Sequence, residues 1–298
     1  MDQPFKGNVL ITGINGFTGF HLEYEMKRLG YFVFGTTFSE PFQKNHFQCD
    51  VLDKAQVKKV LSDIKPDYII HLAAISFVAS ENTSSIYDTN VIGTLNLLEG
   101  LDELGLQVNK ILIASSAAVY GNVEGELSEE MCPKPINHYG NSKLAMEHMV
   151  SNFFNKFDII LMRPFNYTGI AQNKDFLIPK IVDHFKRGLD VIELGNLHTY
   201  REYNSVKSFV TIYIELLNSS FSSGVLNICS GRTYSIENIL KMMKDIANRS
   251  IRVEVNPLFV RKNEIIELKG STKRLFDALG HPVDYIKLKK TLTDMFLN

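Results

Sequence analysis

The 298-residue chain has few cysteines and almost no net charge. Its three cysteines, Cys49, Cys132 and Cys229, are odd in number and widely separated, so they lack the close pairing of a zinc site and suit a reducing compartment. The formal net charge of −1 indicates neither a nucleic-acid surface nor a polybasic membrane patch. Small molecules are therefore the expected partners.

Long apolar runs and metal-ligand patterns are also missing. No apolar run approaches the roughly 20 residues that a membrane helix needs, and the first residues, MDQPFKGN, lack a basic segment followed by an apolar one. The eight histidines include no pair at ligand spacing within one helix. We therefore expect a cytoplasmic protein without a metal site, a membrane contact or a nucleic-acid partner.

Glycine, in contrast, is concentrated in one short segment, VLITGINGFTG, at residues 9–19. Gly13, Gly16 and Gly19 are three apart, directly after an apolar run and directly before a helix-like stretch. Glycine permits the tight turn and the close approach of backbone to a pyrophosphate, and a helix N-terminus supplies free N–H groups. The pattern indicates a dinucleotide site, and a structural glycine turn in another α/β protein is the alternative.

Strand-like runs alternate with helix-like stretches through the first half, as in a parallel sheet covered by helices. The runs are NVLITG, YFVFGTT, YIIHLAA, KILIASS and DIILMRP, and the stretches with helical spacing are residues 20–29, 54–63, 90–104 and 140–155. This pattern predicts an α/β fold with a Rossmann-type doubly wound parallel sheet. We expect residues 1–168 to form a dinucleotide-binding domain and residues 169–298 mainly a smaller C-terminal substrate-binding lobe, with some segments returning to the sheet.

Three side chains suggest catalysis: Ser116, at the end of KILIASS, and Tyr139 with Lys143, in HYGNSK. On a helix, a spacing of four places the tyrosine and the lysine on one face. A nearby ammonium favours phenolate, so the pattern predicts a lowered pKa for Tyr139 and a side chain that can give or take a proton. A chance surface pair is the alternative, but the combination with the glycine turn and the strand-terminal serine is specific.

Over essentially its whole length, the sequence resembles the extended short-chain dehydrogenase/reductase family. The matching segments are TGINGFTG, Asp50 with Val51, HLAA at 71–74, TNVIGTLNLLE at 89–99, SSAAVYG at 115–121, YGNSK at 139–143 and RPFNYTG at 163–169, and REYNSVKS at 201–208 is similar to a worn Arg-Asp-Phe motif. The resemblance implies that Tyr139 is the general acid/base. It also implies that Lys143 tunes Tyr139 and holds the nicotinamide ribose, and that Ser116 hydrogen-bonds the reacting oxygen.

The same resemblance implies a nicotinamide dinucleotide cofactor. Asn90 would support Lys143 through a water, or would cap its own helix, and Asp50 would receive the adenine amino group, or would be a turn residue. The implied cofactor-binding residues are Gly13, Asn15, Gly16, Phe17, Thr18, Gly19, Thr37, Ser39, Asp50, Val51, Leu72, Ala73, Ala74, Asn90, Tyr139 and Lys143.

The end of the second strand bears on the choice of cofactor. Similar epimerases usually carry an acidic residue there, on the adenosine ribose, whereas this chain has Thr37, followed by Phe38 and Ser39. The missing acid removes repulsion toward a 2′-phosphate, which the hydroxyls of Thr37 and Ser39 and the ammonium of Lys44 could contact. NADP(H) is therefore favoured, and NAD(H) is the alternative.

Two alanines limit the reactions that the chain is expected to catalyse. Ala117 and Ala118 stand where similar 4,6-dehydratases carry an acid and where fucose-forming epimerase-reductases carry a cysteine. Because alanine cannot transfer a proton, both reactions are disfavoured. Two reactions remain: simple reduction of a ketone, and oxidation followed by re-reduction that inverts the configuration of one carbon. Residues 163–182, 225–240 and 259–280 resemble most the GDP-4-keto-6-deoxymannose reductases, which form GDP-rhamnose or GDP-6-deoxytalose.

By that resemblance, the substrate is a nucleotide-diphospho sugar, held by Asn166, Arg201, Asn227 and Arg261. The arginines would neutralise the diphosphate as charge-assisted donors, and an exposed, solvated charge is the alternative for each. The expected reaction is NADPH-dependent reduction of the C4 ketone of a 4-keto-6-deoxy sugar, in the deoxysugar biosynthesis that supplies lipopolysaccharide and O-antigen. A C4 epimerase with bound NAD and a non-catalytic NADP-binding regulator are the alternatives.

A homodimer is also expected, since residues 90–104 and 140–155 correspond to the helices that pair across the dimer in this family. The apolar residues that could face a partner, or could equally lie in the core, are Leu95, Leu97, Leu98, Met146, Met149 and Val150.

Overall fold

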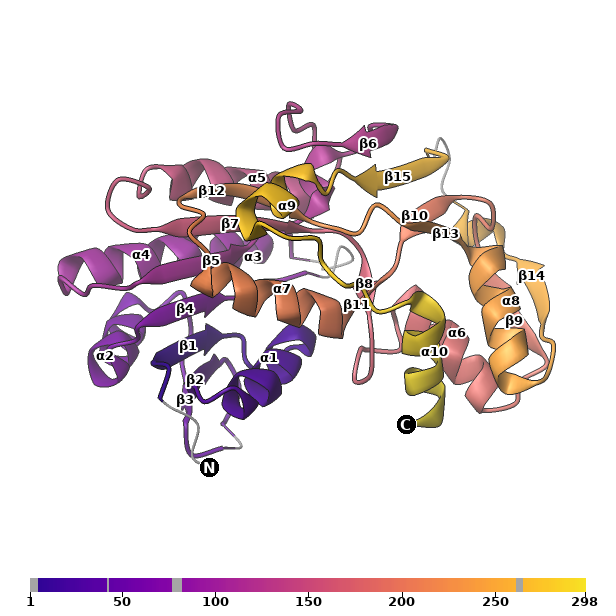
Figure 1. The fold of residues 1–298 in the computed structure, drawn as a ribbon, viewed down its shortest axis with the longest axis horizontal. Helices are drawn as coiled ribbons and strands as arrows, with labels where there is room; N and C mark the ends of the chain where they lie inside the picture. Colours follow the sequence, from indigo (N-terminus) through magenta and orange to yellow (C-terminus); the bar gives the residue numbers. More distant parts are fainter. Residues whose placement is uncertain (1–4, 42, 77–81, 261–264) are drawn as a thin grey trace.

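The computed structural model describes residues 5–41, 43–76, 82–260 and 265–298 (Figure 1). Its largest element is a parallel sheet of seven strands. The strands are β1 (Asn8–Thr12), β2 (Phe32–Thr37), β3 (His46–Gln48), β4 (Tyr68–His71), β5 (Lys110–Ala114), β7 (Ile159–Pro164) and β12 (Gly224–Ile228). Their order across the sheet is β12-β7-β5-β4-β1-β2-β3.

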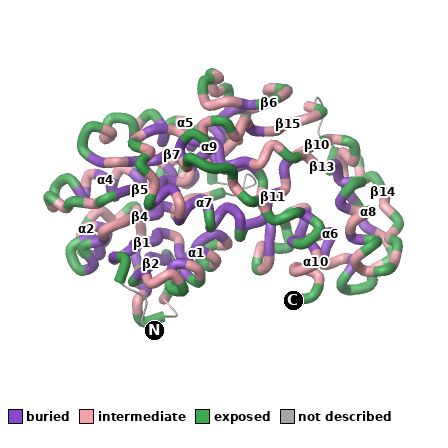
Figure 2. The backbone as a smooth tube through the Cα atoms, viewed as in Figure 1, coloured by how far each residue is buried: buried purple, intermediate pink, exposed green. Residues whose placement is uncertain are grey.

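Helices cover both faces of this sheet, which is why its strands are almost continuously apolar. They are α1 (Phe17–Arg28), α7 (Val206–Asn218) and α9 (Lys273–Leu279) on one face, and α2 (Lys54–Ile64), α4 (Gly93–Glu103) and α5 (His138–Ser151) on the other. Successive strand residues alternate between the two cores, so that Val9 and Ile11 pack with α1 while Leu10 packs with α2. Figure 2 shows the buried residues gathered along these strands and α7. The predicted doubly wound α/β fold is confirmed.

Smaller sheets lie beside the main one. β6 (Gly125–Leu127), β10 (Tyr200–Glu202), β13 (Thr233–Ser235) and β15 (Glu267–Gly270) form a four-stranded sheet, and the two-stranded pairs are β8 (Tyr167–Thr168) with β11 (Asn204–Ser205) and β9 (Val191–Leu194) with β14 (Arg252–Val255). Helices α6 (Leu177–Lys186), α8 (Ile236–Ala247) and α10 (Leu288–Leu297) pack with β9 around a separate core. In Figure 1 this group lies at the right.

The chain crosses between these two groups of elements more than once. α7, β12 and α9 come from the second half of the chain and belong to the main sheet and its core, while β6 comes from the first half and joins the smaller sheet. A domain boundary near residue 168 therefore divides the sequence, but elements from each side of it pack with elements from the other side. The division into two folding units stays a prediction.

Several element bounds differ from those expected. α1 begins at Phe17 rather than at residue 20, and α5 ends at Ser151 rather than at 155. The helix expected over 90–104 is the last part of a longer run, in which α3 (Thr83–Tyr87) and the π-helical turn η1 (Asp88–Ile92) precede α4. β3 has only three residues, too few for its apolar pattern to have stood out.

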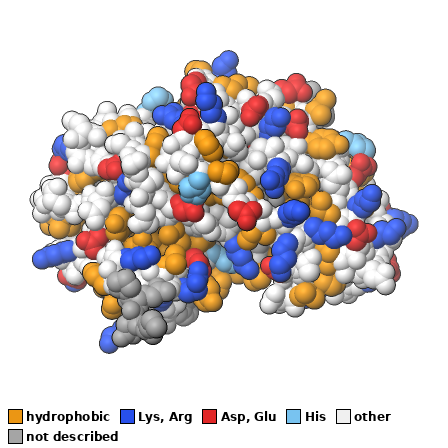
Figure 3. All heavy atoms as spheres, viewed as in Figure 1, with side chains coloured by type: hydrophobic (Ala, Val, Ile, Leu, Met, Phe, Trp, Pro, Cys, Tyr) orange, Lys and Arg blue, Asp and Glu red, His pale blue; other side chains and the backbone are white. Residues whose placement is uncertain are grey.

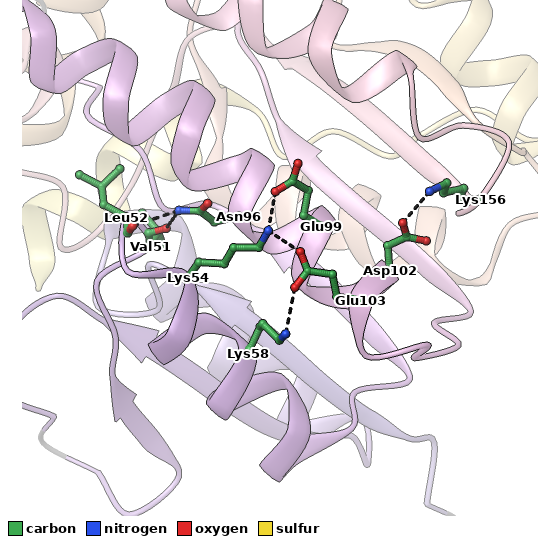
Figure 4. A network of polar contacts seen from close by, with 9 residues as sticks. All are labelled: Val51, Leu52, Lys54, Lys58, Asn96, Glu99, Asp102, Glu103 and Lys156. Carbon is green, nitrogen blue, oxygen red and sulfur yellow. Dashed lines mark hydrogen bonds and ion pairs between the residues drawn. The ribbon is translucent and has the colours of Figure 1, made fainter.

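α4 makes polar contacts both with the loop that follows β3 and with α2 (Figure 4). Asn96, on α4, donates its side-chain amide to the carbonyl oxygens of Val51 and Leu52. On the exposed side, Lys54 bridges the carboxylates of Glu99 and Glu103 at 2.6 and 2.5 Å, an arrangement that contributes little to stability because it is solvated. The amide contacts are therefore what fixes the loop.

Most of the apolar residues considered for a dimer face belong to the core. Leu97, Leu98, Met146 and Val150 are buried between the sheet and its helices, and Met149 packs against the same core. Elsewhere on the surface, Lys and Arg side chains are intermingled with Asp and Glu on the face seen in Figure 3. Among the described residues, no helix is both long enough and apolar enough to cross a membrane.

Candidate active site

The glycine segment forms a closely packed cradle between β1 and α1. Gly13 has a φ of +68°, and a Cβ on it would lie 2.9 Å from the Ala73 nitrogen. A Cβ on Gly19 would lie 2.4 Å from the Ile14 carbonyl oxygen, and Gly16 is the residue from which α1 begins. A side chain at Gly13 or Gly19 would clash with backbone atoms, and the first N–H groups of a helix have no partner within it. The cradle thus fits the pyrophosphate of a dinucleotide.

The segment after β4 is tied directly to the end of β1. The Thr12 hydroxyl accepts hydrogen bonds from the backbone N–H groups of Leu72 and Ala73, each at 3.1 Å. These two residues, with Ala74, were predicted to contact the cofactor, and the structure brings them against the glycine turn at Gly13. Thr12 was not predicted, although it precedes the first glycine in the sequence.

His71 completes this part of the site as a neutral, buried side chain. The Thr94 hydroxyl donates to the Asn90 carbonyl oxygen at 2.8 Å, so its oxygen accepts from His71 Nε2 at 3.0 Å. His71 Nδ1 then accepts from the Thr12 hydroxyl at 2.8 Å, which assigns the Nε2–H tautomer. Burial, and then the charge of Lys143, lower the pKa of His71 to about 3. Sequence analysis overlooked this role, although the HLAA motif contains the residue.

Three of the predicted cofactor-binding residues meet at the end of β2. The Asn15 amide donates to the Thr37 hydroxyl at 3.1 Å, and the hydroxyls of Thr37 and Ser39 are 3.2 Å apart. After β3, an Asp50 carboxylate oxygen accepts from the Leu52 N–H at 2.9 Å, which is the turn arrangement that was the alternative for Asp50. That bond leaves its other oxygen available to an adenine amino group.

α5 begins where it brings Tyr139 to Ser116. The Asn137 side chain caps the helix by accepting from the Gly140 N–H at 2.8 Å. A Cβ on Gly140 would lie 2.7 Å from the Ala118 carbonyl oxygen, so the helix packs tightly against the 3-10 turn η2 (Ala117–Tyr120) that follows Ser116. In this arrangement the Ser116 hydroxyl lies close enough to Tyr139 to act on its pKa.

The expected lowering of the Tyr139 pKa is wrong. Burial raises the pKa of Tyr139 to about 12, and the Ser116 hydroxyl opposes this rise only in part. The Lys143 ammonium donates to the Ala114 carbonyl oxygen at 2.7 Å instead. Burial lowers the pKa of Lys143 to about 8, against the opposing effect of the Glu147 carboxylate. The phenol therefore keeps its proton at neutral pH, which suits a proton donor.

Asn90 does not cap a helix, so that alternative is also wrong. It lies within the π-helical turn η1, where its amide donates to the Ser142 hydroxyl at 3.0 Å and exchanges hydrogen bonds with the backbone of Ile75. The Ser142 hydroxyl in turn donates to the Tyr139 carbonyl oxygen at 2.8 Å. Isolated π turns often occur at functional sites, and this one connects Asn90 to α5 one residue before Lys143.

The helix after the glycine turn contacts β8 through two predicted cofactor residues. The Phe17 ring stacks on Tyr167 with a centroid separation of 5.7 Å, and the hydroxyls of Thr18 and Tyr167 are 2.6 Å apart. The charge of a Tyr167 phenolate would also raise the pKa of Tyr139. Tyr167 therefore belongs to the surroundings of Tyr139, although only its place in RPFNYTG pointed to it.

The predicted substrate residues do not share one environment. Asn166 is exposed, and its carbonyl oxygen accepts from the Asn204 N–H and side chain. Arg201 lies three residues before Asn204 and donates to the backbone carbonyl oxygens of Tyr200, Ile265 and Ile266. Arg261 lies outside the described residues.

The prediction that Asn227 lines the substrate wall is wrong. Its side chain is 0% exposed. The amide oxygen accepts from the Tyr120 hydroxyl at 2.7 Å, and the amide nitrogen donates to the Leu127 carbonyl oxygen at 3.0 Å. Asn227 instead links β12 to the turn after Ser116, because a buried amide needs partners that only the interior supplies there.

Comparisons with known proteins agree on one group. The family model described as GDP-mannose 4,6 dehydratase matches residues 10–295. The chain is 36% identical over 292 residues to GDP-6-deoxy-D-talose 4-dehydrogenase of Aggregatibacter actinomycetemcomitans, covering 97% of both chains. It is 29% identical over 296 residues to GDP-6-deoxy-D-mannose reductase of Pseudomonas aeruginosa, covering 95% of this chain and 94% of the relative.

Solved structures resemble the whole chain as well. A candidate epimerase from Burkholderia cenocepacia J2315 superposes with a TM-score of 0.93 at 35% identity, covering 98% of this chain and 97% of the other. RMD from Pseudomonas aeruginosa, solved in complex with NADPH, superposes with a TM-score of 0.86 at 27% identity, covering 98% of each chain.

Proposed function

Because the chain belongs to the GDP-mannose 4,6-dehydratase family of extended short-chain dehydrogenases/reductases, we propose that it reduces the C4 ketone of GDP-4-keto-6-deoxymannose with NADPH. The observation that carries the proposal is the arrangement at the start of α5, which packs against the turn after Ser116 and brings Tyr139 to that serine, while burial keeps the phenol protonated. The two residues after Ser116 are alanines and cannot transfer the protons that dehydration requires. A member of a dehydratase family is thus equipped for ketone reduction.

The proposed roles follow from the contacts. The Ser116 hydroxyl, held by the Ala118 N–H at 3.1 Å, polarises the ketone by donating to its oxygen. Tyr139 donates its proton to that oxygen as it becomes an alkoxide, and the nearby Lys143 ammonium stabilises the phenolate that results. When bound, the reduced nicotinamide supplies the hydride. Gly13 and Gly19 would hold its pyrophosphate, and Arg201 and Asn166 would bind the substrate.

Two relatives support the substrate class, because both are named for GDP-linked 6-deoxy sugars and for oxidation or reduction. Their names differ in the sugar, and the talose dehydrogenase has the higher identity. We therefore propose GDP-6-deoxytalose as the product in preference to GDP-rhamnose. The proposal places the enzyme in deoxysugar biosynthesis.

The choice of NADPH rests on the end of β2. Thr37 and Ser39 present hydroxyls beside Asn15, and a structural neighbour was solved with NADPH. We expect Thr37→Asp to lower kcat/KM with NADPH by about tenfold to a hundredfold, since a charged hydrogen bond is worth about 1.5–3 kcal/mol and a carboxylate would repel the 2′-phosphate. Activity with NADH should be retained. Steady-state kinetics with both cofactors measure the ratio.

Thr37→Val is the matched control for that substitution. It removes the hydroxyl without adding a charge, so its loss with NADPH should be smaller than that of Thr37→Asp. If both cofactors respond alike to the aspartate, the 2′-phosphate does not lie beside Thr37, and the proposed cofactor preference loses its structural basis.

The function itself is tested by following NADPH consumption with purified protein and GDP-4-keto-6-deoxymannose, with dTDP-, CDP- and UDP-linked 4-keto sugars alongside. Oxidation of NADPH with the GDP substrate alone is the expected result, and NMR of the product should give the C4 configuration of 6-deoxytalose. Oxidation of NADPH with a 4-keto sugar linked to another nucleotide would show that the substrate carries that base instead of guanine. No oxidation with any of these sugars would reject the proposed reductase activity.

The similarity to a candidate epimerase makes C4 epimerisation the second candidate. An epimerase must keep its hydride, so its nicotinamide should stay bound through gel filtration and appear as NAD in the denatured protein. We expect the protein to release no stoichiometric NAD. Stoichiometric NAD together with inactivity toward 4-keto sugars would favour the epimerase.

A further inference from the structure

A buried ion pair lies directly behind the catalytic residues. Arg163, on β7, donates from Nε and Nη2 to the two carboxylate oxygens of Glu147, at 2.9 and 2.6 Å. Both side chains are only 5% exposed, and the Ser115 hydroxyl donates to Glu147 as well. A buried pair of this kind gains little net stability, because desolvation of two charges offsets their attraction. Its presence beside the active site therefore suggests a role in catalysis.

The position of Glu147 on α5 connects the pair to Lys143. The two residues are four apart, so they lie one above the other on the same helix face. Lys143 is buried as well and uses its ammonium to hold the Ala114 carbonyl oxygen. A buried ammonium is stable only if a carboxylate compensates it, and the Glu147 carboxylate is the group that opposes the effect of burial on Lys143.

The other titratable groups around Lys143 supply no negative charge at neutral pH. His71 faces it from β4 and is neutral, because burial lowers its pKa to about 3. Tyr139, one turn before it on α5, keeps its proton because its pKa is raised to about 12. Arg163, from β7, is a second cation. Among the described residues that act on Lys143, Glu147 thus carries the compensating charge.

Arg163 also extends the pair to the turn that follows Ser116. Its Nη1 donates to the Tyr120 hydroxyl at 3.0 Å, and the guanidinium lies over the Tyr120 ring, 4.9 Å from its centroid. Tyr120 in turn donates to Asn227. One network therefore connects the Glu147 carboxylate, one turn after Lys143 on α5, to the turn η2 beside Ser116, and its hydrogen bonds fix the carboxylate in place.

We propose that Glu147, fixed by Arg163 and Ser115, is a positioning residue that keeps Lys143 charged and so sets the alkaline limit of turnover. The inference rests on the proposed function, in which the charged lysine stabilises the Tyr139 phenolate. Without Glu147, Lys143 and Arg163 would be two buried cations with no carboxylate between them. Lys143 would then lose its proton at a lower pH.

The test is the pH dependence of NADPH-linked reduction of GDP-4-keto-6-deoxymannose. In the wild-type protein, activity should fall as the pH rises through about 8, where Lys143 loses its proton. In Glu147→Gln this alkaline limb should move to lower pH by about one to three units, the usual effect of a neighbouring charge. The double variant Glu147→Gln/Arg163→Met also removes the second cation. Its alkaline limb should therefore lie between those of the wild type and of Glu147→Gln, and its fold should be better preserved than that of Glu147→Gln.

Glu23→Gln is the matched control. Glu23 is likewise a buried helix carboxylate held by basic side chains, Lys27 and His46, but it lies on α1, across the sheet from α5. Its alkaline limb should equal that of the wild type. An unmoved limb in Glu147→Gln, in an active and folded protein, would overturn the inference.

A second readout needs no turnover. In protein labelled with ¹³C at lysine Cε, the Lys143 resonance should titrate near pH 8 in the wild type and at lower pH in Glu147→Gln. Equal titration in both proteins would reject the role of Glu147 even if the substrate were wrong. A shifted titration in a protein that reduces no 4-keto sugar would instead reject only the proposed function.

Discussion

Replacing Tyr139 with phenylalanine is expected to lower kcat by about 10²- to 10⁴-fold, the usual contribution of a general acid. In the proposed mechanism the phenol donates its proton to the developing alkoxide, and the structure keeps it protonated, because burial raises its pKa to about 12. Phenylalanine preserves the ring and its packing against η2, so the fold and the cofactor affinity should change little. Turnover and NADPH binding, measured on the same protein, separate the two effects.

Tyr31→Phe is the control for that experiment. Tyr31 is also buried and also loses one hydroxyl contact, to the Asn218 side chain, but it lies immediately before the first residue of β2, at the opposite end of that strand from Thr37. It should retain near wild-type turnover. If Tyr139→Phe were equally active, Tyr139 could not be the proton donor and the mechanism would fail.

Gly19→Ala is expected to damage the cofactor site more than any other single methyl group. The added Cβ would lie 2.4 Å from the Ile14 carbonyl oxygen and 2.8 Å from that of Gly13. Both obstacles are backbone atoms, so a side-chain rotation cannot relieve them. Overpacking costs about 1–3 kcal/mol or more, and α1 must move away from the turn. Fluorescence titration should therefore record NADPH affinity lower by about tenfold to a hundredfold, with a lower melting temperature.

Gly100→Ala gives the matched comparison, because Gly100 is also a helical glycine but its Cβ would meet only flexible side chains, the nearest being Leu61 at 3.2 Å. Alanine favours a helix by about 0.5–1 kcal/mol over glycine, so stability should be kept or gained and NADPH affinity unchanged. Wild-type affinity in Gly19→Ala would mean that the turn does not cradle the pyrophosphate.

Local patterns predicted the parts of the site that depend on the backbone. The glycine spacing specified a turn in which Gly13 adopts a positive φ and Gly19 packs against Ile14. The spacing of four placed Tyr139 and Lys143 on one helix, and Asn137 caps that helix so that Tyr139 meets Ser116. These features follow from short-range geometry, which the order of residues encodes directly.

The errors concern quantities that depend on burial and on contacts across the fold. The Tyr139 pKa rises because the tertiary structure removes solvent from the phenol, while the ammonium of Lys143, one turn away, donates to the Ala114 carbonyl oxygen. Asn227 was expected to bind substrate because its segment resembles that of the GDP-4-keto-6-deoxymannose reductases, yet its side chain is buried in the interior. Asn90 looked like a cap because nothing in the sequence marks the π-helical turn around it.

The residues that were overlooked, such as Glu147 and Arg163, are partners of residues that were found. Their pairing joins positions 16 apart on a helix and a strand, and no local pattern encodes that contact. A carboxylate four residues after the predicted catalytic lysine was the available signal. Charged residues at helical spacing from a predicted catalytic lysine are therefore worth examining when only the sequence is known.

The central claim is most directly tested with NADPH that carries deuterium at the transferable C4 position of the nicotinamide. After incubation with GDP-4-keto-6-deoxymannose, the account predicts one deuterium at C4 of the sugar, none at C5, and the configuration of 6-deoxytalose by NMR. A product without deuterium, or one altered at C5, would contradict reduction of the C4 ketone by this protein.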